Sequence, residues 1–213
     1  MVFTSKLSDY EQYSFSTLKQ ACSNCTKCDL HKDRHQVVFG SGPKQADIMI
    51  VGEAPGEKED EQGLPFVGRS GQLLTTLLEA CGINRNRDVF IANTVKCRPP
   101  KNRTPLAAEI AACKPFLEAQ LNLIKPKIIL LLGSPALKSV LNEKKPISKV
   151  RGIWYKRHVS YMKEPLMIMP LFHPAYLLRN PSKEPGKPIW LTKQDIKQIK
   201  TVFNDKHNLG ETA

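Results

Sequence analysis

The sequence predicts an α/β fold built on a four-stranded, mostly parallel central sheet. Short apolar runs alternate with amphipathic segments along the chain, the order that packs helices against a sheet. The run over residues 127–132 is apolar almost throughout, as expected for a strand buried on both faces. Loops rich in glycine, proline and polar residues follow several runs, and ligands bind at such strand ends in open α/β sheets.

The composition fits one globular domain over residues 1–213, with residues 1–16 as an amphipathic lead-in helix or a partly ordered arm. The net charge of +12 indicates a polyanionic partner, or else solubility alone. No apolar run approaches the roughly 20 residues of a membrane span, and the N-terminus lacks the apolar core of a signal peptide. We therefore expect a cytoplasmic protein, nucleoid-associated in a prokaryote, whose six cysteines bind metal or stay free.

Two overlapping C-x-x-C pairs follow the N-terminal segment, formed by Cys22, Cys25 and Cys28. Position 32 is a lysine where a bacterial ferredoxin run needs a fourth cysteine, so any cluster must recruit distant ligands. Cys97 and Cys113 are available, but they are too far apart in sequence for the second close pair of a zinc ribbon. Thiolates suit iron–sulfur clusters, and the alternative is a set of buried free cysteines.

The first strand, residues 48–51, leads into a long loop that ends in a helix over residues 72–78. The loop holds five glycines and the acids Glu53, Glu57, Glu59, Asp60 and Glu61. It lacks a nucleotide-binding lysine motif, so a triphosphate site is disfavoured. Phe66 lies among the glycines, where an aromatic ring can serve as a stacking platform. The alternative is a solvated acidic loop with a core phenylalanine.

The second strand, residues 89–92, delivers Asn93 at its carboxyl end. An amide offers one acceptor and two donors side by side, which suits base-edge recognition, although Asn93 also suits a local turn. Thr104 and Pro105 predict the start of the next helix, which carries Cys113 on its apolar face. The third strand, residues 127–132, leads into a helix over residues 136–141.

Basic and aromatic residues alternate over residues 144–157, a pattern typical of a nucleic-acid surface or of a solvated hairpin. The fourth strand, residues 167–171, ends at His173. A single histidine is more often structural than catalytic, but its place at a strand end favours a role in a site. A helix over residues 191–203 completes the predicted fold.

The segment Gly52–Leu74 resembles the first motif of the family 4 uracil-DNA glycosylases, the iron–sulfur type. That motif reads GEAPG, then ED, then G-x-PFVGR-x-G-x-LL, and this sequence matches throughout. The family's N-x-x-K-C-R-P-P follows the second strand here, and its H-P-[AS] follows the last. The matches run from about Cys25 to Pro181. The resemblance implies a three-layer αβα sandwich and a DNA repair glycosylase that flips deoxyuridine out of DNA and hydrolyses its N-glycosidic bond.

The resemblance also implies roles for individual residues. Phe66 would stack on uracil, Asn93 would read its edge, His173 would donate to O2, and the backbone of Glu53 and Ala54 would touch the base. Glu53 and Glu59 remain alternatives for the carboxylate that stabilises the sugar cation and orients water. The cluster would be [4Fe–4S], held by Cys25, Cys28, Cys97 and Cys113, although Cys22 with Cys25 is a second possible pair. DNA contacts would come from Arg151, Leu178 and Arg179.

We expect a monomer that binds uracil-containing DNA and no membrane. Some relatives trap the abasic sugar on a histidine after the Asn strand, but residues 94–104 contain none, so we expect turnover. Two other functions remain open: a related iron–sulfur glycosylase for another deaminated base, and a non-catalytic iron–sulfur nucleic-acid-binding protein. A zinc deaminase would need H-x-E with P-C-x-x-C, which the sequence lacks.

Overall fold

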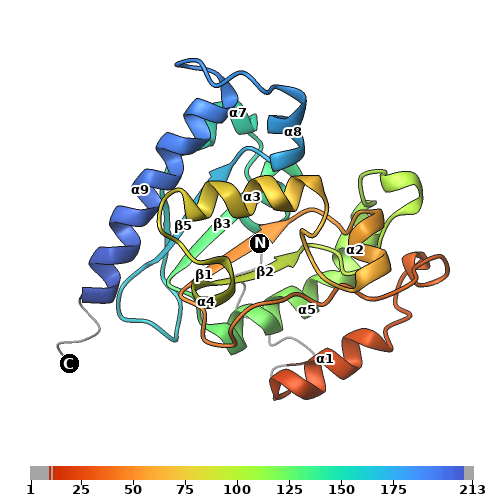
Figure 1. Ribbon diagram of the computed structural model, residues 1–213. Helices are drawn as coiled ribbons and strands as arrows, with labels where there is room; N and C mark the ends of the chain where they lie inside the picture. The colour runs from red at the N-terminus through yellow and green to blue at the C-terminus, as the bar shows by residue number, and fades with distance from the viewer. Residues whose placement is uncertain (1–9, 11, 209–213) are drawn as a thin grey trace.

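A computed structural model describes residue 10 and residues 12–208, so most of the predicted arm over residues 1–16 lies outside the described residues. The central sheet has the strand order β2-β1-β3-β5-β4 (Figure 1). Its strands are β1 (Ile48–Gly52), β2 (Val89–Asn93), β3 (Ile128–Leu132), β4 (Tyr155–Arg157) and β5 (Leu166–Leu171). Neighbouring strands among β1, β2, β3 and β5 pair in parallel, and β4 pairs antiparallel with β5. The α/β prediction is confirmed.

The expectation of four strands is wrong by one, because β4 extends the sheet at its edge. Tyr155 pairs with Ile168, and Arg157 pairs with Leu166. Three partly exposed residues are too few to produce a recognisable alternation in the sequence, and the surrounding lysines and arginines resemble a solvated loop. Charged residues on a short edge strand also discourage pairing with a second chain.

Helices cover both faces of the sheet, as the three-layer expectation requires (Figure 1). The longer α-helices are α1 (Phe15–Ser23), α3 (Arg69–Glu79), α5 (Ala107–Ile124), α6 (Gly133–Leu141) and α9 (Pro188–Asn208). Short α-helices are α2 (Glu57–Gln62), α4 (Arg85–Asp88), α7 (Ile147–Val150) and α8 (Pro174–Arg179), and 3-10 turns span Asp29–His31 and Pro100–Asn102. No helix among the described residues is both long and apolar enough to cross a membrane.

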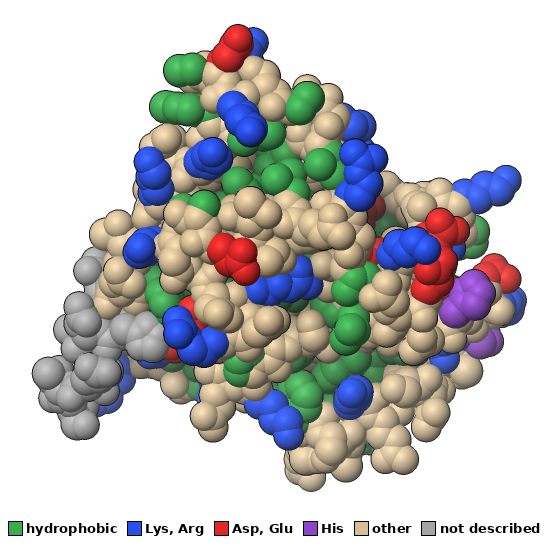
Figure 2. Space-filling model, in the orientation of Figure 1, with side chains coloured by type: hydrophobic (Ala, Val, Ile, Leu, Met, Phe, Trp, Pro, Cys, Tyr) green, Lys and Arg blue, Asp and Glu red, His purple; other side chains and the backbone are tan. Residues whose placement is uncertain are grey.

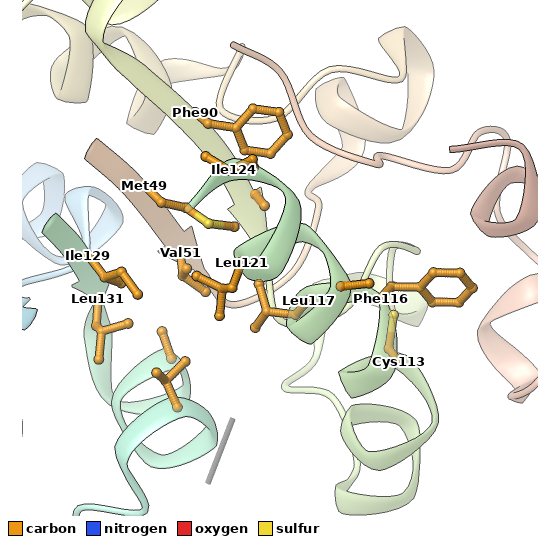
Figure 3. Packing of buried hydrophobic residues seen from close by; sticks show 14 of the residues in the cluster. Met49, Val51, Phe90, Cys113, Phe116, Leu117, Leu121, Ile124, Ile129 and Leu131 are labelled. Atoms are coloured by element: carbon orange, nitrogen blue, oxygen red, sulfur yellow. The ribbon is translucent and has the colours of Figure 1, made fainter. Parts of the chain in front are cut away.

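The core forms two layers because successive residues of β1 point to opposite faces of the sheet. Ile48 and Ile50 belong to the layer under α3 and α9. Met49 and Val51 belong to the opposite layer, where Leu121 and other residues of α5 pack against them (Figure 3). Burial on both faces explains why the strand sequences are continuously apolar.

The parallel strands bring four chain segments to one edge of the sheet. In the β1–β2 register, Gly52 pairs with Asn93, so the loops that follow these two strands start side by side. β3 and β5 run in the same direction, and they deliver Gly133 and His173 just beyond the same edge. The sequence elements singled out at strand ends therefore converge in space.

Candidate active site

A cleft of about 810 Å³ lies at this edge of the sheet. Loops after β1, β2, β3 and β5 line it, together with residues 99–104 and α8. Figure 2 shows the outline of the molecule indented between α8 and α2, which both contribute residues to the cleft wall. All six predicted catalytic and uracil-binding residues line it: Glu53, Ala54, Glu59, Phe66, Asn93 and His173. The cleft is of the size that commonly binds one small ligand or one base.

Asn93 lies at the inner end of the cleft, with only 1% of its surface exposed. Its Oδ1 is the one buried side-chain oxygen or nitrogen without a hydrogen-bond partner in the described part of the chain. A Cβ at Gly52 would lie 2.4 Å from this oxygen and 2.7 Å from the Phe66 ring, so only glycine leaves room for both side chains. An unpaired buried acceptor is costly, and one that faces a cleft is suited to bind a ligand N–H donor.

Phe66 adopts a strained backbone conformation that its surroundings enforce. Its φ is +52°, a value unusual for a residue other than glycine. Arg85 donates hydrogen bonds to the carbonyl oxygen of Pro65 at 2.7 Å and to the Thr75 hydroxyl at 2.8 Å. A Cβ at Gly71 would lie 1.8 Å from the Phe66 carbonyl oxygen, so α3 meets the loop backbone directly. These contacts fix the aromatic ring in the cleft wall.

His173 is held as a neutral ring with its free N–H available to the cleft. It precedes α8, and its Nδ1 accepts a hydrogen bond from the Ala175 backbone N–H at 3.1 Å. In the neutral ring this bond leaves the proton on Nε2. Burial, and secondarily the positive charge of Arg179, lower the pKa of His173 to about 4. The ring centroid lies 5.8 Å from that of Phe66, so both rings border the same space.

The two predicted carboxylates have different surroundings. Glu59 accepts backbone hydrogen bonds from Val67 and Gly68 at 2.9 Å and from Gly56 at 3.1 Å, so its oxygens already brace the loop around Phe66. Glu53 lines the cleft half-exposed. Burial raises the pKa of the Glu53 carboxyl, while a hydrogen bond with the Thr104 side chain opposes the shift.

The three predicted DNA contacts do not form one surface. Arg179 lines the cleft on α8, and Leu178 beside it is exposed but outside the lining. Arg151 lies away from the cleft lining, because its Nε donates to Asp195 Oδ2 at 2.7 Å and its guanidinium contacts both carboxylate oxygens. Asp195 is fully buried on α9. The structure therefore gives Arg151 an internal partner, and its role as a DNA contact stays a prediction.

A second, smaller cavity collects five of the six cysteines: Cys22, Cys25, Cys28, Cys97 and Cys113. The sixth, Cys81, lies elsewhere, at the end of α3. Three Lys and Arg side chains border the cavity: Arg34, which donates to Cys97 Sγ at 3.3 Å, fully buried Lys96, and Lys27. No three Cys, His, Asp or Glu side chains of the described residues are placed around a single metal ion. A set of thiol donors is the kind of ligand set that suits an iron–sulfur cluster.

Comparison with known proteins identifies the family. A sequence model of the Uracil DNA glycosylase superfamily matches residues 39–198. A type-4 uracil-DNA glycosylase of Thermotoga maritima is 46% identical over 187 residues, covering 87% of this chain and 93% of that protein. The chain belongs to the type-4 uracil-DNA glycosylase family.

Type-4 uracil-DNA glycosylases of two archaea are also similar to this member of the family. The protein of Saccharolobus solfataricus is 43% identical over 187 residues, covering 85% of this chain and 83% of the relative. That of Sulfurisphaera tokodaii is 40% identical over 197 residues, covering 89% and 84%. The family resemblance drawn from the Gly52–Leu74 motif is thus confirmed over most of the chain.

The cleft of this family member also contains residues that the sequence analysis did not select: Thr104, Ser134 and Tyr176. Ser134 follows β3 directly, so the strand-end rule that selected Asn93 and His173 would have found it. Thr104 was read only as a helix cap. Tyr176 stands two residues after Pro174 with 38% of its surface exposed, and nothing in the sequence pattern distinguishes it.

Proposed function

We propose that the protein excises uracil from DNA by flipping deoxyuridine into the cleft and hydrolysing the N-glycosidic bond. The observation that carries this proposal is the buried amide of Asn93, which lines the cleft beside Phe66 and has no hydrogen-bond partner for its Oδ1. An enzyme that acts on a base must take it out of the stack and read it in a closed pocket. The family membership and the relatives' uracil-DNA glycosylase names support the same reaction.

Base recognition would use one aromatic face and one amide. The Phe66 ring would stack on the uracil plane, and Asn93 Oδ1 would accept from N3–H while Nδ2 donates to O4. Cytosine presents the opposite pattern at both positions and would leave two buried polar groups facing like groups. The backbone of Glu53 and Ala54 would border the same base edge, since both residues line the cleft.

Cleavage of the glycosidic bond would develop negative charge on uracil O2 and positive charge on the sugar. His173 would donate its Nε2–H to O2 as a neutral ring, a role that its hydrogen bond from Ala175 N–H supports. Glu53 would stabilise the sugar cation and orient the attacking water, whose oxygen bonds to C1′ as the C1′–N1 bond breaks. The bonding electron pair would leave with uracil, and the water proton would pass to the Glu53 carboxylate. Glu59 would act as a positioning residue, because backbone N–H groups already occupy both of its oxygens.

DNA binding would centre on α8. Arg179 lines the cleft and would contact a phosphate, and exposed Leu178 beside it would enter the gap left by the flipped nucleotide. Lys and Arg side chains are spread over the face seen in Figure 2 and form no single patch there, so net charge alone does not locate the contact surface. We propose that the protein acts as a monomer. We propose the cytoplasm as its compartment.

We propose that Cys25, Cys28, Cys97 and Cys113 hold a [4Fe–4S] cluster, which supplies a structural cross-link when bound. These ligands would join the segment after α1 to the loop after β2 and to α5. Cys22 lines the same cavity from the last turn of α1. It is a fifth thiol at a site for which we propose four ligands. Burial raises the pKa of the Cys113 thiol to about 12, so the thiolate form depends on a bound metal.

Uracil release from DNA tests the function directly. The purified protein is incubated with oligonucleotides that carry a single uracil, hypoxanthine, xanthine or thymine, and free base and alkali-labile sites are measured. We expect release of uracil well above the other bases. Release of a different base instead would favour the related-glycosylase alternative, and binding of DNA without release of any base would favour a non-catalytic module.

A further inference from the structure

We propose that residues 34–36 form a strap that couples the cysteine cavity to the loop holding Phe66, with Arg34 and Asp60 as positioning residues. The strap is part of the segment between the 3-10 turn at Asp29–His31 and β1. Its Arg34 end contacts the cysteine cavity, and its other end contacts α2, which carries Glu59. The inference rests on the proposed function of the Phe66 loop in binding the base. It assigns a purpose to Asp60, a buried carboxylate that the cleft chemistry does not use.

Arg34 is the cysteine end of the strap. Its Nη1 donates to the Cys25 carbonyl oxygen at 2.7 Å and to Cys97 Sγ at 3.3 Å, and its Nη2 donates to the Ser23 carbonyl oxygen at 3.2 Å. One guanidinium therefore contacts the segment after α1 and the loop after β2 at once. Because a guanidinium is a planar fork with fixed donor directions, its position follows any movement of these groups.

The next two residues of the strap hold Asp60 of α2. The His35 backbone N–H donates to Oδ1 and Oδ2 at 3.1 and 3.2 Å, and the His35 ring Nδ1 lies 2.7 Å from Oδ2. The Gln36 N–H donates to Oδ1 at 3.4 Å, and its side chain donates to the Glu61 carbonyl oxygen at 2.6 Å. Asp60 is 1% exposed, so a buried carboxylate fixes α2 to the strap. Buried charges persist only where such partners hold them.

Asp60 is adjacent in sequence to Glu59, whose carboxylate organises the Phe66 loop. Glu59 accepts from Val67 and Gly68 N–H, the two residues that follow Phe66, at 2.9 Å. A shift of the helical turn that carries Asp60 would therefore shift Glu59 and withdraw its support from Phe66. The strained φ of +52° at Phe66 makes this support necessary, because a residue in that region relaxes when its surroundings loosen.

The strap leaves little slack between its two ends. Arg34 and His35 are consecutive, and adjacent Cα atoms are only about 3.8 Å apart. A change at the cysteine cavity, such as loss of its metal, would move Arg34 and reach Asp60 through one peptide unit. A metal bound in the cysteine cavity would then keep the Phe66 loop ordered, although the cavity and the cleft share no lining residue.

Amide hydrogen exchange measured on the protein as isolated tests the coupling without any enzymatic assay. Arg34→Lys keeps the positive charge but loses the planar guanidinium that contacts several groups at once. Asp60→Asn keeps the shape of the side chain but turns an amide NH2 toward the backbone N–H donors of His35 and Gln36. We expect each to raise exchange of the Val67 and Gly68 amides about tenfold or more. Exchange in β3 should stay unchanged, which shows that the variants are folded. Glu61→Gln is the matched control, because the Glu61 carboxylate is exposed and pairs with Lys58 at the surface, while its backbone contact with Gln36 is kept.

A kinetic measurement separates positioning from general damage. The rate of uracil release per active molecule, at saturating DNA in a single turnover, should fall about tenfold in Asp60→Asn while DNA affinity and iron content stay unchanged. His35→Ala removes one hydrogen bond of a largely exposed ring and should produce a smaller effect of the same kind. Unchanged exchange at Val67 and Gly68 in both Arg34→Lys and Asp60→Asn would overturn the strap. This outcome is independent of whether the protein excises uracil at all.

Discussion

At the scale of single residues, the site depends on side chains whose state is set by one or two neighbours. The proton of His173 is directed to Nε2 by a backbone N–H, and the Asn93 amide is left with an open acceptor. Glu53 and Glu59 differ because backbone donors occupy only Glu59. The role we propose for each side chain thus depends on whether its polar atoms already have a hydrogen-bond partner in the protein or remain available to a ligand.

Exchange of Asn93 for aspartate should change base specificity. A buried aspartate tends to be protonated, because burial disfavours its charged form. Its hydroxyl could then donate to cytosine N3, and its carbonyl could accept from cytosine N4. We expect Asn93→Asp to lose uracil release by about 100-fold, since each unpaired buried group costs about 1–3 kcal/mol, and to gain weak cytosine release. Asn93→Ala is the control that should lose uracil activity without the gain. Full uracil activity in Asn93→Asp would exclude Asn93 as the base reader.

As pH is lowered, the loss of activity should follow protonation of Glu53 and not protonation of His173. The proposed active form has a charged Glu53 and a neutral His173. Burial raises the pKa of Glu53 above its ordinary 4.5, and burial lowers the pKa of His173 to about 4. As pH falls, Glu53 therefore takes up a proton first, so the single-turnover rate should decline with a midpoint above 4.5. Glu53→Gln should be slow and nearly flat across that range, and an unchanged acid limb in this variant would reassign the limb to another group.

At the scale of elements, several boundaries differ from the sequence-based prediction for identifiable reasons. Thr104 and Pro105 were expected to begin a helix, but α5 begins at Ala107. The Glu109 carboxylate accepts from the Leu106 N–H at 2.7 Å and from Arg103, so this acid caps the helix in place of Thr104. α5 also continues through Pro115, because burial of its apolar face against the sheet outweighs the hydrogen bond that proline removes.

Neutralisation of Arg151 and of Arg179 should affect two different properties of the protein. Arg151→Gln leaves the fully buried Asp195 without its cation, so we expect a loss of about 3–5 kcal/mol in the free energy of unfolding. Its DNA affinity should stay unchanged. Arg179→Gln should keep the stability but weaken DNA binding and reduce the slope of log K against log salt by about 0.9, one phosphate contact.

Denaturant unfolding and DNA binding at several salt concentrations measure both effects on the same preparations. The two variants remove the same charge, so each serves as the control for the other. Weakened DNA binding with normal stability in Arg151→Gln would support Arg151 as a DNA contact.

At the scale of the whole molecule, the cleft and the cysteine cavity are two separate cavities built from neighbouring parts of the chain. The cleft gathers the strand ends, and the cysteine cavity ties α1, the loop after β2 and α5 together on the other side of that loop. The residues from Asn93 to Cys97 connect them along the chain, and the strap of residues 34–36 connects them through space. The fold therefore joins the cysteine cavity to the cleft through a short stretch of chain.

The metal content of anaerobically purified protein should be about four irons per chain, with the brown colour of a [4Fe–4S] cluster. Serine in place of Cys25, Cys28, Cys97 or Cys113 should lose iron and lower the melting temperature, because a cross-link between three segments is removed. Cys81→Ser should retain iron, since Cys81 lies away from the cavity. Iron and sulfide analysis with visible absorbance measures the result. Stoichiometric zinc, or iron retained in Cys97→Ser, would contradict the assignment.

Cys22 provides a sharper version of the same measurement, because it lines the cavity without a proposed role as a ligand. Cys22→Ser should keep iron, as Cys81→Ser does. Loss of iron from Cys22→Ser with retention in Cys28→Ser would select the alternative C-x-x-C pair.

The sequence by itself determined the elements whose signals are local. The four parallel strands, the glycine-rich loop and the residues at the strand ends follow from apolar runs and from motifs within about twenty residues. Parallel strands then bring Glu53, Asn93 and His173 to one edge, so most of the candidate site could be predicted.

Only the tertiary structure decided the features that depend on partners remote in sequence. Arg151 meets Asp195 across 44 residues, and His35 meets Asp60 across 25. β4 is a strand only because β5 offers it an edge, and Glu59 braces a loop that the motif alone could not orient. The physical reason is that hydrogen-bond and charge partners are chosen by proximity in the folded chain, which no local pattern of residues records.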